Sequence, residues 1–133
     1  DAIGTPGERF NPLGEFAAAG VPVTLSSDAP VAEPLPLQAI QTAVTRTTAR
    51  GHRLGADSLR ISVEQALAGH TLAGAWALGR EDDLGSITAG KRADFVVLGD
   101  DPLDVPAEAI QDIPVVSTWV GGQRVHQLEG AGE

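Results

Sequence analysis

The sequence has no cysteine, no methionine and no tyrosine, and aromatic residues make up only 4% of its 133 positions. The lack of cysteine excludes disulfide bonds and zinc sites built on thiolates. With so few large side chains, the core has to consist of alanine, valine, leucine and isoleucine. Because even an initiating methionine is missing, we expect the chain to be a piece of a longer polypeptide.

Positive charge and long apolar runs are also scarce. Nine basic residues stand against 18 acidic ones, which gives a net charge of −9. Nucleic acids and anionic membranes are bound largely through lysine and arginine, so neither is an expected partner. No apolar run approaches the roughly 20 residues of a membrane-spanning helix. The first residues lack the basic and apolar regions of a signal peptide, so we expect a cytoplasmic protein.

What the sequence does contain is a series of short elements separated by 16 glycines and 9 prolines. The pattern predicts a loop over residues 1–12, a helix over 13–19, a strand over 20–28, a helix from 36 to about 50 and a polar loop over 51–60. Ser62 and Gln65 have the spacing of a capping box. After an interruption at Gly69 and His70, a second short helix is predicted over 72–78, with Thr71 as its N-cap.

The second half of the sequence changes from a helical to an extended pattern. It predicts a tight turn over 85–91, a buried strand over 94–98, a turn over 100–103, one helical turn over 106–110 and strands over 115–120 and 123–126. Gly121-Gly122 joins the last two strands as a two-residue hairpin. The tail after Leu128 is polar.

Asp28 is the first candidate for a functional residue. It follows an apolar stretch at the point where the predicted strand ends, and in α/β folds and barrels the carboxyl ends of strands are where ligands and metals bind. Ser27, Asp28 and Pro30 are also ordinary turn residues. From these residues alone, a turn and a site both remain open.

Several motifs occur in a characteristic order along the chain. The first half contributes Gly20-Val21-Pro22-Val23, Ser26-Ser27-Asp28-Ala29-Pro30, Pro36-Leu37, Ala43-Val44-Thr45-Arg46 and Glu64-Gln65-Ala66-Leu67. Downstream comes the segment from Gly85 through Lys91 to Leu98. In this order the motifs resemble those of metal-dependent amidohydrolases, with amidohydrolase family 3 as the closest match, and the downstream segment resembles the superfamily signature G-x-I-x-x-G-K-x-A-D-hydrophobic. The resemblance spans the chain from about Phe10 to His126.

The resemblance implies an α/β fold that is only part of a larger one. Residues 1–83 would be the C-terminal part of a (β/α)8 barrel, with its last strand and the following helices. Residues 84–133 would supply the C-terminal strands of a small β-sandwich domain. Asp28 matches the aspartate at the end of the last barrel strand, which ligates the metal and takes a proton from the attacking water.

The other metal ligands that the resemblance requires are missing from this sequence. The family has an early His-x-His pair, a bridging lysine or acidic residue and two further histidines, whereas His52, His70 and His126 lack such spacing. One carboxylate does not hold a catalytic metal, because such sites take three or more protein ligands. We expect a divalent metal, zinc, in the complete parent protein, no tight metal binding by this chain and no activity of the chain alone.

Four further residues are interpreted beside Asp28. Arg46, after an apolar helix, either hydrogen-bonds a loop carbonyl or carboxylate near the site or is a solvated helix-end cation favoured by the helix dipole. Asp94 is interpreted as part of a structural turn that ties the sandwich to the barrel. Trp76 and Trp119 are interpreted as packing residues. No motif identifies the residues that bind substrate.

Three functions follow from these observations. The first is a fragment of a metal-dependent hydrolase whose parent acts on an amide or cyclic amide C–N bond of a small molecule. The second is a non-enzymatic scaffold that pairs with the missing N-terminal part or with a second copy through exposed strand edges. The third is a parent that acts as a deaminase or an isomerase-like member of the superfamily.

Overall fold

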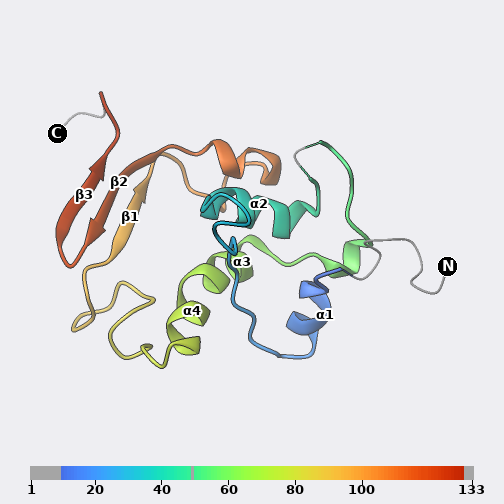
Figure 1. The fold of residues 1–133 in the computed structure, drawn as a ribbon, viewed down its shortest axis with the longest axis horizontal. Helices are drawn as coiled ribbons and strands as arrows, with labels where there is room; N and C mark the ends of the chain where they lie inside the picture. Colours follow the sequence, from blue (N-terminus) through green and yellow to red (C-terminus); the bar gives the residue numbers. More distant parts are fainter. Residues whose placement is uncertain (1–9, 49, 131–133) are drawn as a thin grey trace.

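The computed structural model describes residues 10–48 and 50–130. Its helices fill the middle and one end of an elongated molecule, and a three-stranded sheet lies at the other end (Figure 1). The expected loop over residues 1–12 lies mostly outside the described residues. No helix within the described ranges is long and apolar enough to cross a membrane.

The first two helices begin where the sequence predicts but are shorter than expected. α1 (Leu13–Ala18) is followed by Gly20, whose φ of 69° is the left-handed conformation that commonly ends a helix. α2 (Pro36–Thr45) has its proline in the first turn, where the missing N–H costs nothing. It ends at Arg46, with φ 54°, rather than near Arg50. The predicted C-terminus was wrong because Arg46 leaves the helical conformation to make tertiary contacts.

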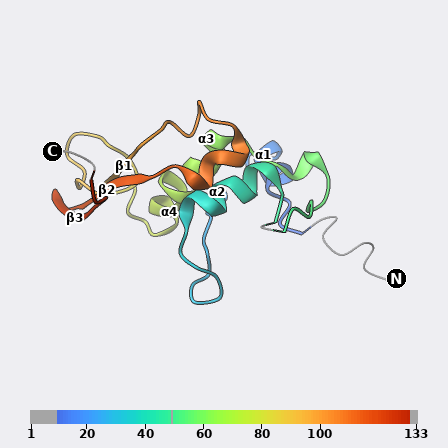
Figure 2. The ribbon, with the colours of Figure 1, turned by 90° about the horizontal axis from the view of Figure 1, so that it is seen from above.

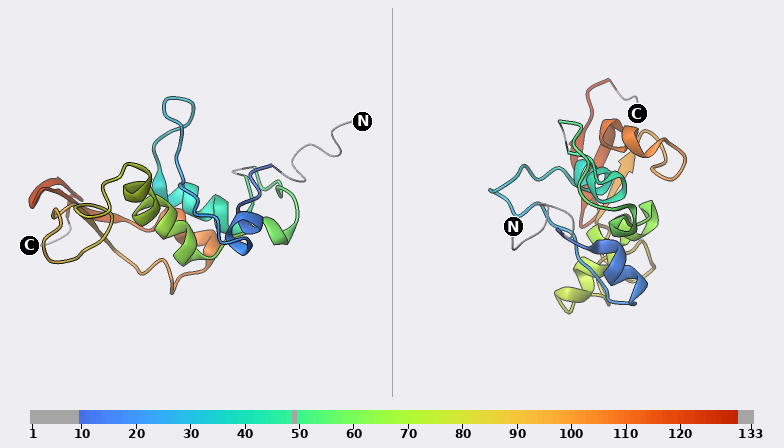
Figure 3. Two further views of the ribbon diagram at one scale, coloured as in Figure 1. Left: turned by 90° about the horizontal axis from the view of Figure 1, so that it is seen from below. Right: turned by 90° about the vertical axis from the view of Figure 1, so that its right-hand side faces the viewer.

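The strand predicted over residues 20–28 is absent from the described structure, and this prediction was wrong. Residues 21–28 are irregular and pair with no strand. A strand is stable only beside another strand that takes up its backbone hydrogen bonds, and the described chain offers none at this place. Part of the segment between α1 and α2 instead forms a loop that projects away from the helices (Figures 2 and 3).

Two helices follow the loop over residues 50–60, which contains the 3-10 turn η1 (Asp57–Leu59). The capping box at the start of α3 (Val63–His70) is confirmed: the Ser62 side chain accepts from Gln65 N, and the Gln65 side chain accepts from Ser62 N. Gly69 lies inside α3 and does not interrupt it. Thr71 lies at the predicted N-cap position of α4 (Leu72–Ala77), but its hydroxyl donates to the Leu67 carbonyl and makes no capping hydrogen bond.

The sheet consists of β1 (Phe95–Leu98), β2 (Val115–Val120) and β3 (Gln123–Gln127), antiparallel in the order β1-β2-β3. The predicted Gly121-Gly122 hairpin is confirmed, with φ 57° and 78°. The prediction that the first strand is buried was wrong, because Val96 is 52% exposed. No second sheet within the described residues covers this strand.

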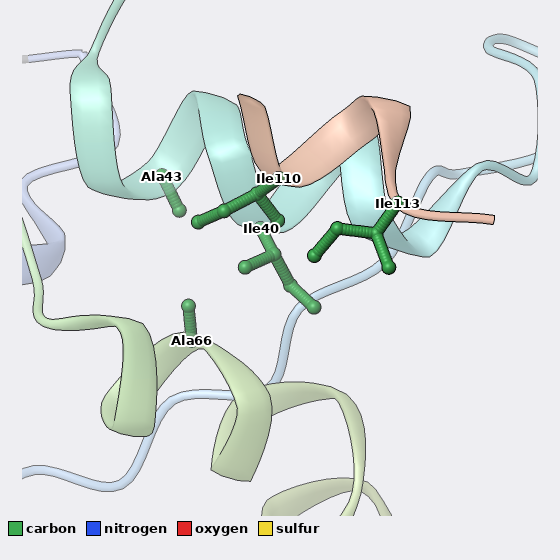
Figure 4. Packing of buried hydrophobic residues seen from close by; sticks show 5 residues of the cluster. All are labelled: Ile40, Ala43, Ala66, Ile110 and Ile113. Carbon is green, nitrogen blue, oxygen red and sulfur yellow. The ribbon is translucent and has the colours of Figure 1, made fainter. Parts of the chain in front are cut away.

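The hydrophobic core joins the two halves of the chain. Between β1 and β2, the 3-10 helix η2 (Ala107–Asp112) packs against α2. Side chains from α2, α3 and the η2 region point toward one another there (Figure 4): Ile40, Ala43, Ala66, Ile110 and Ile113. Because its members are aliphatic, this cluster has the composition expected from the sequence.

The described residues form a small α/β piece without a closed barrel. Four α-helices and one three-stranded antiparallel sheet are present among residues 10–48 and 50–130. The expected barrel strand does not form, whereas the helices expected to follow it do. The division at residue 83/84 stays a prediction.

Candidate functional site

Asp28 lies in the exposed loop between α1 and α2. Its backbone is left-handed, with φ 56°, a conformation that aspartate tolerates better than most residues. Its N–H donates to the Ser26 hydroxyl at 3.1 Å, and its carbonyl accepts from Val31 N at 2.8 Å. The backbone is therefore held in a local turn while the side chain is exposed. Both possibilities that the sequence left open, a turn and an accessible carboxylate, are compatible with this geometry.

The chain that leads to Asp28 is held against α3 at a glycine. Leu25 N donates to the Gly69 carbonyl at 3.1 Å. A Cβ atom at position 69 would lie 2.9 Å from the Leu25 Cγ atom, closer than packed carbon atoms come. Gly69 thus permits a close approach that the sequence did not reveal. An isolated glycine within a helical pattern is the signal that could have indicated it.

Two cavities lie beside Ser26 and Ser27, the residues that precede Asp28. One, of about 290 Å³, is lined by these serines together with Asn11, Glu33, Arg46 and apolar neighbours. The other, of about 240 Å³, has His70 in its wall. The loop is thus flanked by spaces that contain both polar and apolar side chains.

His70 is a half-buried residue with a buried Nε2 atom, and the sequence analysis placed it only between two helices. It is the last residue of α3, and its Nε2 atom has no hydrogen-bond partner within the described residues. Burial lowers the pKa of His70 below its ordinary value, because an apolar environment disfavours the charged imidazolium. His52 lies in the loop before η1, and His126 is exposed on β3, as expected from the sequence.

Arg46 is 4% exposed, so it is not a solvated helix-end cation. Its Nε donates to the Leu54 carbonyl at 3.1 Å, its Nη1 to the Asn11 carbonyl at 3.1 Å, and its Nη2 to the Phe10 carbonyl. The alternative of a hydrogen bond to loop carbonyls is confirmed. Burial lowers the pKa of Arg46, but an arginine stays charged at any physiological pH.

The turn before β1 has a structural role, but its observed contacts lie within the sheet and the preceding turn, so the expected tie between sandwich and barrel stays a prediction. The Asp94 carboxylate accepts from Gly121 N at 2.6 Å and so ties the start of β1 to the β2–β3 turn. Lys91 Nζ donates to the Leu84 carbonyl at 3.1 Å and to the Glu81 carbonyl, which closes the preceding turn. Asp94 therefore fixes the sheet itself.

The two tryptophans differ in their surroundings. Trp119 stacks on Phe95 with ring centroids 5.6 Å apart, and the Arg124 guanidinium lies 5.8 Å from its ring centre. Trp119 is thus a packing residue, as expected. Trp76 is 57% exposed on α4, so the expectation of packing was wrong for it. Nothing in the described chain covers this face of the helix.

The described residues supply only part of a metal site. They contain no group of three histidine, cysteine, aspartate or glutamate side chains that could hold a metal ion. Asp28 offers one accessible carboxylate, whereas catalytic zinc takes three or more protein ligands. The donors present in these residues therefore do not fit a complete metal centre.

Comparison with known proteins gives matches along most of the chain. The model of the amidohydrolase family matches residues 3–126. The N-substituted formamide deformylase of Arthrobacter pascens is 36% identical over 123 residues, 92% of this chain and 22% of that protein. The protein LONG AFTER FAR-RED 3 of Arabidopsis thaliana is 38% identical over 106 residues, 78% of this chain and 18% of that protein.

A solved structure agrees with these matches. The amidohydrolase from Thermotoga maritima MSB8 superposes with a TM-score of 0.64 and 26% sequence identity. The similarity covers 87% of this chain and 26% of that one. The chain thus spans between 18% and 26% of the length of these three relatives.

Proposed function

Because the chain belongs to the amidohydrolase family, we propose that it is the C-terminal part of a metal-dependent hydrolase acting on a small molecule. The bond cleaved is a non-peptide C–N bond, in an amide or cyclic amide. The relative from Arthrobacter pascens supports this class of substrate, because its name describes an enzyme for N-substituted formamides. The small share of each relative that the chain covers supports its being one part of the enzyme.

The exposed carboxylate of Asp28 is the observation that carries this proposal. It lies in a loop whose backbone is held by Ser26 and Val31, beside two cavities, and nothing buries it. A carboxylate held in this way is suited to accept a proton from the attacking water and to return it to the leaving nitrogen. It also offers one oxygen ligand to a metal.

A divalent metal, zinc in our proposal, would make water a stronger nucleophile near neutral pH. Asp28 would contribute one ligand to such a centre, and because the described residues contain no group of three such donors, the remaining ligands would come from the rest of the enzyme. It follows that this chain alone binds no metal tightly and is inactive. The residues that bind substrate would then lie both beside the two cavities and outside this chain.

The first test is the substitution Asp28→Asn in the complete protein that carries this chain. We expect kcat to fall by at least about 100-fold on a panel of N-formylated amines, N-acylated amines and cyclic amides, because loss of a general base typically has effects of this size. Zinc content is measured in parallel by elemental analysis. We also expect less bound zinc, because a ligand is lost.

Asp82→Asn is the matched control, since Asp82 is exposed in the turn before the sheet. It should leave kcat and zinc content unchanged. If Asp28→Asn keeps full activity, Asp28 has no catalytic role. If the wild-type complete protein neither binds zinc nor hydrolyses any member of the panel, the proposed enzyme class is wrong.

A second candidate is a non-enzymatic scaffold that associates through its sheet. The sheet has two free edges within the described residues, β1 and β3, and Val96 and Val97 on β1 are exposed. Free strand edges favour pairing with another chain. The partner would be the missing N-terminal part of the enzyme or a second copy of this chain.

A further inference from the structure

Arg46 joins three separate parts of the chain. It ends α2, and its side chain donates to the carbonyls of Phe10 and Asn11, immediately before α1. It also forms a reciprocal pair with Leu54: Leu54 N donates to the Arg46 carbonyl at 2.7 Å, and Arg46 Nε donates to the Leu54 carbonyl at 3.1 Å. One side chain thus holds two loops against the end of one helix.

These contacts form one wall of the larger of the two cavities beside Ser26 and Ser27. Arg46 and Asn11 line that cavity together with Ser26 and Ser27. Ser26 in turn accepts the hydrogen bond from Asp28 N. The guanidinium therefore fixes the cavity wall that faces Ser26 and Ser27, the residues that lead to Asp28.

Only arginine has the geometry for this arrangement. Its planar fork points several N–H groups in fixed directions, whereas lysine carries one flexible ammonium group. Hydrogen bonds from a charged donor to a carbonyl are stronger than those between neutral groups. Removal of the guanidinium would leave the carbonyls of Phe10, Asn11 and Leu54 without this donor in three partly buried hydrogen bonds, which is unfavourable.

We propose that the cavity lined by Asn11, Ser26, Ser27 and Arg46 receives part of a small polar substrate, and that Arg46 is the positioning residue that shapes it. This rests on the proposed function, since the cavity is taken to belong to the active site of the hydrolase. Arg46 acts through the backbone that it holds and touches no reacting atom. The role therefore concerns substrate binding more than the chemical step.

The test compares Arg46→Met, Arg46→Lys and the control Arg80→Met in the complete protein. Arg80 forms an exposed ion pair with Asp83, and such a pair should contribute little to the stability of the protein. We expect Arg46→Met to raise KM about tenfold, with a smaller change in kcat, because the cavity wall that Arg46 holds would lose its position. Arg46→Lys keeps the charge but lacks the planar fork, so its KM should lie between those of the wild type and Arg46→Met. The KM of Arg80→Met should equal that of the wild type.

Hydrogen exchange in the same variants measures the anchoring independently of activity. The amides of Leu13 and Leu54 donate to the carbonyls of Asn11 and Arg46. Both should exchange faster in Arg46→Met than in the wild type or in Arg80→Met. Arg46→Lys, the milder substitution, provides the same comparison if Arg46→Met does not fold.

The outcomes separate this inference from the proposed function. Faster exchange with an unchanged KM would overturn the inference, because Arg46 would then only stabilise the fold. Unchanged exchange would overturn it as well, because the anchor would not exist. A wild-type protein without hydrolysis or zinc would refute the proposed enzyme, while the exchange experiment would still decide whether Arg46 anchors these loops.

Discussion

Arg46 and His70 both bring polar atoms into the interior, with opposite results. The Arg46 guanidinium donates to three carbonyls, whereas the His70 Nε2 atom is buried without a partner among the described residues. An unpaired polar atom away from water raises the free energy of the folded state. For His70, the same environment also makes the stability depend on pH.

We predict that the protein loses stability as the pH falls below about 6.5, the ordinary pKa of histidine. Burial lowers the pKa of His70 in the folded state, so the unfolded state binds the proton first and is favoured by acid. Above that pH both states are neutral and His70 contributes no pH dependence. The measurement is the urea midpoint at pH 7.5 and pH 5.5.

Two histidine substitutions isolate this effect from the titration of carboxylates. His70→Gln should lose less stability between pH 7.5 and pH 5.5 than the wild type. His126→Gln, on the exposed face of β3, should behave as the wild type does. If His70→Gln and the wild type lose the same amount, His70 is not the source of the dependence.

Among the elements, α3 and α4 each contain one glycine, in different surroundings. Gly69 on α3 faces Leu25 and Val23 of the chain that leads to Asp28, whereas Gly74 on α4 has open space where a Cβ atom would be. The same substitution should therefore have opposite effects at these two positions. The difference comes from packing, because both residues are helical.

We predict that Gly69→Ala destabilises the protein by about 1–2 kcal/mol, since overpacking of this kind outweighs the gain in helix propensity. Gly74→Ala should instead stabilise it by about 0.5–1 kcal/mol, the usual benefit of replacing a helical glycine. Urea unfolding measures both free energies. Equal stabilisation by both substitutions would show that α3 does not pack closely on residues 23–25.

For the whole molecule, the main feature is how much apolar surface stays exposed. Fifteen large hydrophobic residues among those described are exposed, whereas the buried core contains seven residues, three of them alanines. Ile87 is 88% exposed and Trp76 57%. Soluble monomers rarely leave such an amount of apolar surface uncovered, which agrees with a chain that spans between 18% and 26% of the three relatives compared above.

We predict that the 133-residue chain by itself associates and binds a hydrophobic dye such as anilinonaphthalene sulfonate. The net charge of −9 opposes association, so the effect should grow as salt screens the charge. Sedimentation velocity at about 20 mM and about 300 mM salt measures it. Trp76→Lys should reduce dye binding, whereas a dye-free monomer at high salt would contradict the prediction.

The sequence alone determined the local structure that depends on neighbouring residues. The capping box of Ser62 and Gln65, the proline in the first turn of α2 and the Gly121-Gly122 hairpin are all confirmed. Each depends on hydrogen bonds or backbone angles within a few residues, so the order of residues is enough to specify it. The family membership was likewise predicted from motifs and confirmed.

Only the tertiary structure decided what depends on distant partners. Residues 20–28 have the pattern of a strand but form none, because no strand in the described part of the chain lies beside them to take up their hydrogen bonds. Arg46 turns inward because carbonyls at Phe10, Asn11 and Leu54 are brought to the end of α2. A sequence gives the side chains and their local order, whereas burial and hydrogen-bond partners are set by contacts between segments that only folding brings together.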